Sequence, residues 1–285
     1  MSAGGGWRFA FSKGWLGYLA FAIAFAIACG FLSNWQLARS KEAAAANALI
    51  AANFDSRPVP LTEELPTLSA YSKSQEWTRV TVTGTYEPDR QLLARNRPLN
   101  GNPGFEVLTP LRTADGSLFI VDRGWVPTGN DSDDPDHVPA PPSGTVTVVA
   151  RLKASEPAIS GRTASGDQVG TIQLSVVKEK LDGADVYTGA YGLLDSESPA
   201  PATAPTPTVS APPTQDEGLH WSYMIQWIIF ALIGFFGLGY ALVTEYRKRN
   251  EHDPAEQARA AERARKRALK RTDADVEDEL LDASR

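Results

Sequence analysis

Two long apolar runs, one near each end of the chain, enclose a more polar middle segment. The first covers residues 15–32, and the second continues from Trp221 to Val243 without a charged residue. At ~1.5 Å per residue, a helix over the second run is ~34 Å long, which is enough to cross a bilayer core of ~30 Å. The first run, of ~18 residues, is near the lower limit for a span. The pattern predicts two transmembrane helices.

The first run has two other interpretations. A signal peptide is also an apolar segment near the N-terminus, and the residues before Cys29 weakly resemble a lipoprotein cleavage site. We favour a retained helix, because small residues recur along it and suit close packing against another helix. They are Ala20, Ala22, Ala24, Ala26 and Ala28. Cys29 is the only cysteine, so no intrachain disulfide can form, and in a retained helix it is a buried thiol.

The middle segment, residues 34–195, has the short alternating and apolar stretches of a β-rich domain. Strands are predicted at residues 77–86, 91–95, 105–109, 118–121, 146–152, 172–174 and 186–194. Residues 118–121 are continuously apolar, a pattern typical of a strand buried on both faces, and residues 122–127 are expected to end it. Ser175 can cap a short helix that continues to Leu181. The fold class is therefore a membrane protein with two transmembrane α-helices flanking a β-rich α+β domain.

The segments around this domain have distinct compositions. Alanine-rich residues 42–52 are expected to continue the first helix out of the membrane. Residues 196–218 contain six prolines and predict an extended linker, without a core, that returns the chain to the membrane. Residues 244–285 form a charged tail, in which a helix from Pro254 to Arg271 precedes acidic residues 273–282. That helix either lies on anionic lipid headgroups or is solvated.

The distribution of charge predicts the topology. Arg8 and Lys13 precede the first run without an acidic residue, and residues 247–249 are all basic. Since basic flanks mark the cytoplasmic side, the predicted cytoplasmic parts are residues 1–13 and 244–285. The predicted spans are residues 14–33 and 219–243, paired as a hairpin, and residues 34–195 are extracytoplasmic. No Arg/Ser-rich transit segment is present, which favours a bacterial plasma membrane. The net charge of −6 gives no indication of a nucleic-acid partner.

The entry of the second span carries the candidate chemistry. His220, Tyr223, Met224 and Trp227 are three, four and seven positions apart, so they share one face of a helix. A neutral imidazole is a good metal ligand, but an interfacial histidine also commonly faces water or bonds a backbone carbonyl. The other two histidines fall in the outer domain and the cytoplasmic tail, and no nucleophile has a base at workable spacing. The pattern therefore does not indicate an enzyme.

A second candidate metal-binding site is an acidic loop at residues 128–144, which contains four aspartates and His137. Such a cluster either binds a hard cation or is a solvated turn. We favour the turn, because the spacing matches no known cation-binding loop.

Three separated patterns together resemble the surfeit-locus-one (Surf) family of cytochrome c oxidase biogenesis proteins. They are Trp35-Gln36 with Arg39 and Lys41 after the first span, Val-Asp-Arg-Gly-Trp-Val-Pro at residues 121–127, and His-Trp-Ser-Tyr at residues 220–223 with Gln226-Trp227. The Arg-Gly-Trp-Val-Pro element is the most specific. Order and spacing agree from about residue 14 to residue 243. The family usually has asparagine where Asp122 stands, and the proline-rich and C-terminal segments have no counterpart that we can place.

The resemblance implies an assembly factor that helps insert haem a into the large oxidase subunit. It implies haem a binding through His220. For such a site, the chemistry of the neighbouring residues predicts Trp227 and Tyr223 beside the ring and Arg39 paired with a propionate. Trp35 is the remaining candidate of this site. The partners would be oxidase subunits, the haem a synthesis machinery and the lipid bilayer.

Each of these residues also has a simpler interpretation. Trp35 and Trp227 fit an interfacial aromatic belt, and Arg39 fits a side chain that reaches the headgroups. Arg123 and Trp125 are better explained as structural residues at the end of a buried strand. Two other functions remain open: a scaffold or accessory oxidase subunit that never binds haem, and, more weakly, a membrane-tethered enzyme of haem modification.

Overall fold

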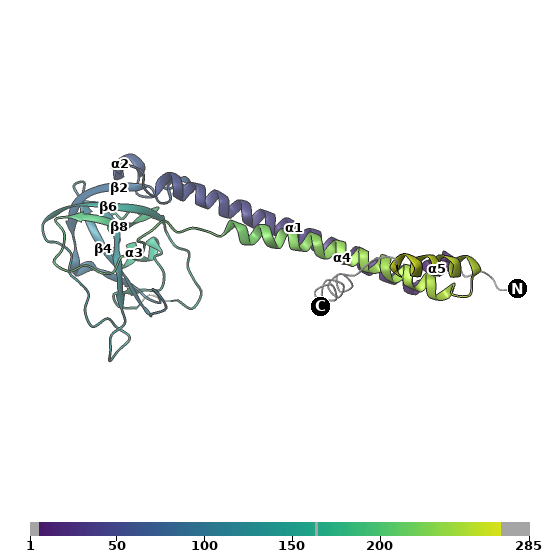
Figure 1. Cartoon of the computed structure of the whole chain (residues 1–285). Coiled ribbons are helices and arrows are strands. Elements are labelled where there is room, and N and C mark those ends of the chain that lie inside the picture. Colours follow the sequence, from purple (N-terminus) through teal and green to yellow (C-terminus); the bar gives the residue numbers. More distant parts are fainter. Residues whose placement is uncertain (1–5, 163–164, 269–285) are drawn as a thin grey trace, which may run out of the picture. The chain divides into compact units, whose positions relative to one another are not determined.

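The computed structural model describes residues 6–162 and 165–268 (Figure 1). It divides into two compact units, one of Met1–Lys41 with Asp216–Arg285 and one of Glu42–Gln215. The helices are η1 (Trp7–Phe11), α1 (Lys13–Asn53), α2 (Leu61–Glu64), η2 (Lys73–Gln75), η3 (Pro88–Arg90), α3 (Leu174–Lys180), α4 (Glu217–Arg249) and α5 (Pro254–Ala268). The predicted acidic segment 273–282, and the predicted end of α5 at Arg271, lie outside the described residues.

The first unit is built on α1 and α4, which are long and apolar enough to cross a membrane. They run antiparallel, because contacts pair later residues of one helix with earlier residues of the other. The Ser33 hydroxyl donates to the Met224 carbonyl at 3.2 Å. At the other end of the pair, the ring of Trp7 stacks on that of Tyr246 at 4.4 Å. Figure 1 shows the two helices side by side.

The packed face of α1 repeats every seven residues. The buried residues of α1 in this unit are Ala22, Cys29 and Gln36, followed by Ser40, which lies four residues after Gln36. On α4 the half-buried positions include two series with the same spacing of seven. One is His220, Trp227 and Gly234, and the other, four residues later, is Met224, Ala231 and Leu238. This is the spacing of a left-handed coiled coil. The predicted alanine pattern is therefore only partly right: residues 20, 24 and 28 are exposed, because alternate residues cannot share one helix face.

The second unit is a β domain whose strands close into a ring. The strands are β1 (Val59–Pro60), β2 (Arg79–Tyr86), β3 (Leu92–Ala94), β4 (Gly104–Thr113), β5 (Leu118–Pro127), β6 (Thr145–Ala154), β7 (Gln168–Val169) and β8 (Ala190–Ser198). Their order is β1-β2-β6-β8-β5-β4-β3-β7, and β2 also pairs with β4. That additional pairing closes β2, β6, β8, β5 and β4 into a small barrel. The predicted β-rich domain is confirmed.

Two apolar cores lie on the two faces of this ring. One contains alternate residues of β2 and β6, such as Val82 and Val148, together with Phe119 and Val121 of β5. The other contains Leu118 and Ile120 of β5 and the helix residues that cover that face. Because successive side chains of a strand point to opposite faces, β5 contributes to both cores. The prediction that residues 118–121 are buried on both faces is confirmed.

Several predicted boundaries were wrong. β4 continues to Thr113 rather than Thr109, and α3 begins at Leu174, so Ser175 lies inside the helix and does not cap it. β5 does not end at Asp122 but continues to Pro127. Gly124 makes this continuation possible: its φ of +127° is a conformation that L side chains rarely adopt, and a Cβ there would lie 2.6 Å from the Thr206 carbonyl oxygen. Residues 172–174 are not a strand and lead into α3. The last strand begins at Ala190 rather than at residue 186, and Val186 forms only an isolated bridge.

The proline-rich segment is extended but is packed on the domain. Its Thr206 forms both backbone hydrogen bonds with Trp125, at 2.7 and 2.9 Å, and Pro205 is buried. The segment therefore forms an isolated antiparallel bridge with β5 at Trp125, just past the positions where β5 pairs with β8, which are Val121 and Asp122. The prediction of a linker without packed residues was wrong here, because proline at the edge of a sheet leaves neighbouring residues free to pair.

Arg123 is the largest fully buried side chain of the described residues. Its side chain is fully buried and donates to the carbonyls of Pro139 and Ala140 at 2.9 and 3.2 Å. Its guanidinium lies over the Tyr86 ring at 5.5 Å. The Trp125 indole donates to the Arg97 carbonyl at 2.6 Å. These contacts support the structural interpretation of Arg123 and Trp125.

Asp122, on the opposite face of β5, is a buried carboxyl group. Burial raises the pKa of its carboxyl well above the usual range, and the nearby Glu106 adds to the effect. One of its oxygens accepts from the Gly124 N–H at 3.0 Å. An asparagine side chain has the same shape and can accept the same bond.

We predict that Asp122→Asn raises the free energy of unfolding at pH 7. The carboxyl loses its proton near pH 3.9 in the unfolded chain but at a higher pH in the folded domain, so parent stability falls as pH rises above about 4. Asparagine does not titrate, so we expect the variant to gain about 1 kcal/mol or more at pH 7 and little near pH 4. Urea unfolding of the full chain in detergent, followed by tryptophan fluorescence, measures both values.

Asp195→Asn is the control with the opposite sign. Burial disfavours its charge, but hydrogen bonds from Arg79 and Arg151, at 2.5 and 2.6 Å, outweigh this and hold the pKa of Asp195 below its usual value. Its contribution to stability is present above about pH 3.9 and is lost as pH falls. The control should lose about 1–3 kcal/mol at pH 7. A loss of stability in Asp122→Asn that grows from pH 4 to pH 7 would contradict the assignment.

Candidate cofactor site

The start of α4 is fixed by a side-chain cap. Asp216 precedes the helix, and its carboxylate accepts from the Leu219 N–H at 3.0 Å. Such a cap satisfies one of the amide groups that have no partner within the helix. The cap sets where the helix begins and places His220 in its first turn, on the face that packs against α1.

His220 contacts Gln36 of α1 across the helix pair. The distance between the imidazole Nδ1 and the Gln36 amide Oε1 is 2.9 Å. Gln36 is 9% exposed and His220 is half-buried. Because an amide oxygen only accepts hydrogen bonds, Nδ1 is the donor, and the neutral ring keeps a lone pair on Nε2. Histidines that bind metals commonly have this arrangement, with the second nitrogen donating to an oxygen.

Of the other residues of the predicted site, one lies on the same helix face as His220 and the rest are exposed. Trp227 is half-buried on the same face as His220, and its ring meets that of Phe230 edge-on at 5.8 Å. Tyr223 is 42% exposed and Trp35 is 55% exposed. Arg39 is also exposed, one helical turn after Gln36. The helix pair thus brings His220, Gln36 and Trp227 to one face, while Trp35 and Tyr223 point outward as interfacial aromatics do.

A groove of about 460 Å³ lies between the two helices and begins one turn below His220. Its volume is within the range of about 300–1,000 Å³ typical of small-molecule sites. Almost all of its lining is apolar. The lining residues are Ala26, Cys29, Gly30, Ser33, Asn34 and Leu37 of α1, and Met224, Trp227, Ile228, Ala231, Leu232 and Phe235 of α4. We call it the Cys29 groove.

These residues fit a haem. One neutral imidazole nitrogen is available as an axial ligand, and indole, thioether and aliphatic groups lie on the same side. Sequence reasoning found His220 and Trp227, but it did not assign a role to Gln36. The sequence feature that could have identified Gln36 is its position in a seven-residue repeat with Cys29 and Ala22.

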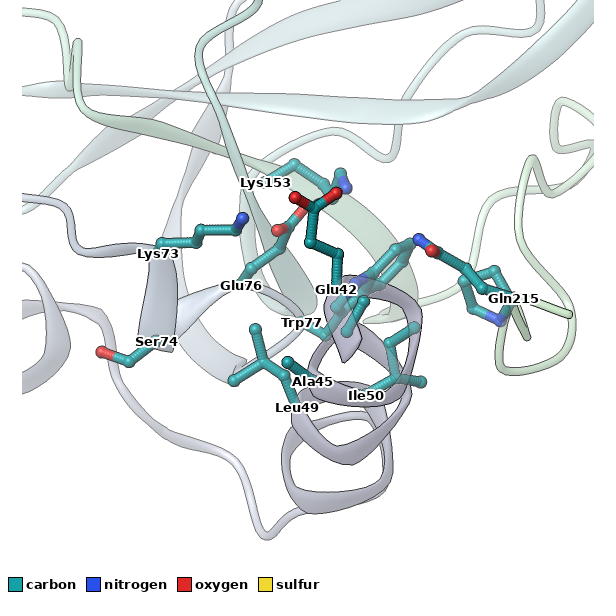
Figure 2. Close-up of a pocket in the computed structure, with 12 residues that line it drawn as sticks. Glu42, Ala45, Leu49, Ile50, Lys73, Ser74, Glu76, Trp77, Lys153 and Gln215 are labelled. Carbon is teal, nitrogen blue, oxygen red and sulfur yellow. Dashed lines mark hydrogen bonds and ion pairs between the residues drawn. The ribbon is translucent and has the colours of Figure 1, made fainter. Parts of the chain in front are cut away.

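A second cavity, of about 570 Å³, lies inside the Glu42–Gln215 unit (Figure 2). Its floor is apolar and includes Leu49, Ile50 and the ring of Trp77. Lys153 pairs with Glu76, and its ammonium lies 4.2 Å from the centre of the Trp77 ring. Trp77 has a φ of +70°, which is unusual for a bulky residue, and its N–H donates to the Leu152 carbonyl at 2.9 Å. None of the predicted cofactor residues lines this cavity.

The acidic loop does not gather into a metal site. No group of three or more potential ligands that could hold a metal ion occurs within residues 6–162 and 165–268. Within the loop, the Asp136 carboxylate accepts from the Asn130 amide at 2.6 Å, and Asp134 accepts from Gln168 at 2.6 Å. His137 is exposed. These contacts agree with the favoured interpretation of a solvated turn.

The fold and the site together define a pair of apolar helices, separated in the sequence by a β domain, with a histidine where the second helix begins. The model of the SURF1 family matches residues 23–232, which is most of the chain. The chain therefore belongs to the SURF1 family, a family of oxidase assembly factors rather than of enzymes.

Curated relatives agree with this assignment. Uncharacterized SURF1-like proteins of Mycobacterium bovis and Mycobacterium tuberculosis are 36% identical over 246 residues, which is 85% of this chain and 88% of theirs. A SURF1-like protein of Rickettsia felis is 30% identical over 101 residues, or 35% of this chain and 42% of its own.

Proposed function

We propose that this protein is an assembly factor for haem-copper cytochrome c oxidase that binds haem a through His220. The observation that carries the proposal is the hydrogen bond from Nδ1 of His220 to Gln36, which leaves Nε2 free to bind iron. Haem a is the cargo of the protein, and its acceptor is the large oxidase subunit. The other proposed partner is the machinery that synthesises haem a.

Each residue of the site has a separate part in this proposal. His220 coordinates the iron, and Gln36 holds the ring in the required tautomer and orientation. Trp227 provides an apolar wall for the macrocycle. Arg39 is the proposed partner of a propionate, because guanidinium groups bind carboxylates with two parallel hydrogen bonds. Tyr223 and Trp35 are at the edge of the site, at the level of the lipid headgroups.

We also propose that both helices span the plasma membrane of a bacterium, with the β domain outside. The helix pair supports this, because more of its basic residues lie at one end than at the other: Arg8, Lys13 and residues 247–249 against Arg39 and Lys41. The Arg249 guanidinium lies 5.0 Å from the centre of the Phe9 ring, next to Arg8 in sequence. Basic residues at one end indicate the cytoplasmic side for both termini. Residues 42–215, inserted between the two helices, are then on the opposite side.

The topology predicts a protease result. Protease added to intact spheroplasts should cleave the chain within residues 42–215 and leave a tag at the C-terminus attached to a protected fragment. After the membrane is permeabilised, the same tag should be lost. Loss of the tag from intact spheroplasts would contradict the proposed orientation.

Haem binding predicts a coloured protein. The chain purified from cells that synthesise haem a should show a haem absorption spectrum, and His220→Ala should lose at least 90% of the bound haem. His252→Ala is the control and should retain it, because His252 is exposed and lies near the far end of α4. Colourless parent protein that still purifies with oxidase subunits would favour the scaffold instead.

The role of Gln36 can be tested separately. We expect Gln36→Leu to weaken haem binding by about 10–100-fold, as is typical when the hydrogen-bond partner of a metal-binding histidine is lost. Gln36→Glu keeps an acceptor and should retain binding, with a lower reduction potential because a carboxylate makes the imidazole more basic. Gln226→Leu is a matched control on the exposed side of α4. Unchanged affinity and spectrum in Gln36→Leu would exclude a positioning role.

A further inference from the structure

We propose that the Cys29 groove binds the isoprenoid side chain of haem a and so selects haem a over haem b. The inference rests on the proposed binding of haem at His220. Haem a differs from haem b in a formyl group and in a long branched hydrocarbon chain derived from farnesyl. A carrier that coordinates only the iron does not distinguish the two, so selection requires a second site beside the histidine.

The groove is continuous with the proposed iron site. Met224 and Trp227, four and seven residues after His220, line it and lie on the same face of α4. It continues along α4 to Phe235, 15 positions after His220 in the sequence, which corresponds to ~22 Å of helix. A chain attached to a macrocycle at His220 can therefore enter the groove at Met224 and lie along the helix pair.

The groove is hollow because both helices present small residues there. Ala26, Cys29 and Gly30 line it from α1, and Ala231 lines it from α4. A Cβ built on Gly30 meets no atom within 4 Å, so space is open at this point. The large side chains of Trp227 and Phe235 border the same hollow. Small residues between large ones leave a space that a flexible chain can occupy.

The lining suits hydrocarbon and not a charged group. Ser33 is one of two polar side chains in it, and its hydroxyl already donates to the Met224 carbonyl. The other, Asn34, lies towards the outer end of the helix, where the propionates and water are expected. Surrounding lipid is as apolar as the isoprenoid chain, so the hydrophobic effect gives no preference. The groove must therefore select haem a through van der Waals contacts between its walls and the isoprenoid chain. These contacts depend on how well the two shapes match.

The experiment compares two haems on the full chain in detergent. Absorbance titration with haem a and with haem b gives both affinities for the parent and for Gly30→Leu, which fills the open space. The parent should bind haem a at least tenfold more tightly than haem b. Gly30→Leu should reduce haem a affinity to the level of haem b and leave haem b affinity unchanged. Gly17→Leu is the matched control, because Gly17 also has open space but lies outside the groove.

The outcomes separate this inference from the proposed function. Equal affinity of the parent for the two haems, or full haem a affinity in Gly30→Leu, would overturn the groove assignment while haem binding at His220 stands. Haem b affinity reports whether the variant is folded, since Gly30→Leu leaves His220, Gln36 and Trp227 unchanged. If the parent binds neither haem, or if His220→Ala binds both, the proposed function fails and the groove inference fails with it.

Discussion

The hydrogen bond between His220 and Gln36 sets the register of the two long helices. Both groups are polar and lie within an apolar helix pair, where an unpaired donor or acceptor costs about 1–3 kcal/mol. A shift of one helix by a residue would separate them, whereas the aliphatic contacts around them tolerate such a shift. A single polar pair has this effect in coiled coils, where it fixes register at some cost in stability. Here the group that fixes register is also the proposed ligand.

The seven-residue repeat explains why a groove follows this pair. On α1 the buried residues of the repeat are Ala22, Cys29 and Gln36. Ala22 and Cys29 are small, and such residues leave space wherever the facing residue is also small, as Ala231 is. The repeat therefore produces both the close contact at Ser33 and the hollow beside Gly30. The same property of the sequence gives the helix pair its stability and its cavity.

Sequence patterns predicted most elements but not the contacts between distant segments. Alternation found β2 and β6, and continuous apolarity found the start of β5. The end of β5 was missed, because Gly124 and Pro127 usually interrupt a strand. Here the continuation pairs with β4, from Glu106–Trp125 to Gly104–Pro127. His220 and Trp227 were found through helical spacing and a family resemblance. Gln36 was missed because the partner of a histidine 184 residues away cannot be deduced from local periodicity.

Asp122 shows how a departure from the family pattern can leave the chemistry unchanged. The resemblance led us to expect asparagine at this position, and a charged carboxylate would be strongly disfavoured beneath the β5 backbone. Burial raises the pKa of Asp122 and so favours its protonated form, and its side chain accepts the Gly124 N–H as an asparagine oxygen would. That bond supports the glycine whose backbone turns β5 toward Thr206. The substitution therefore preserves the strand that joins the barrel to the segment leading into α4.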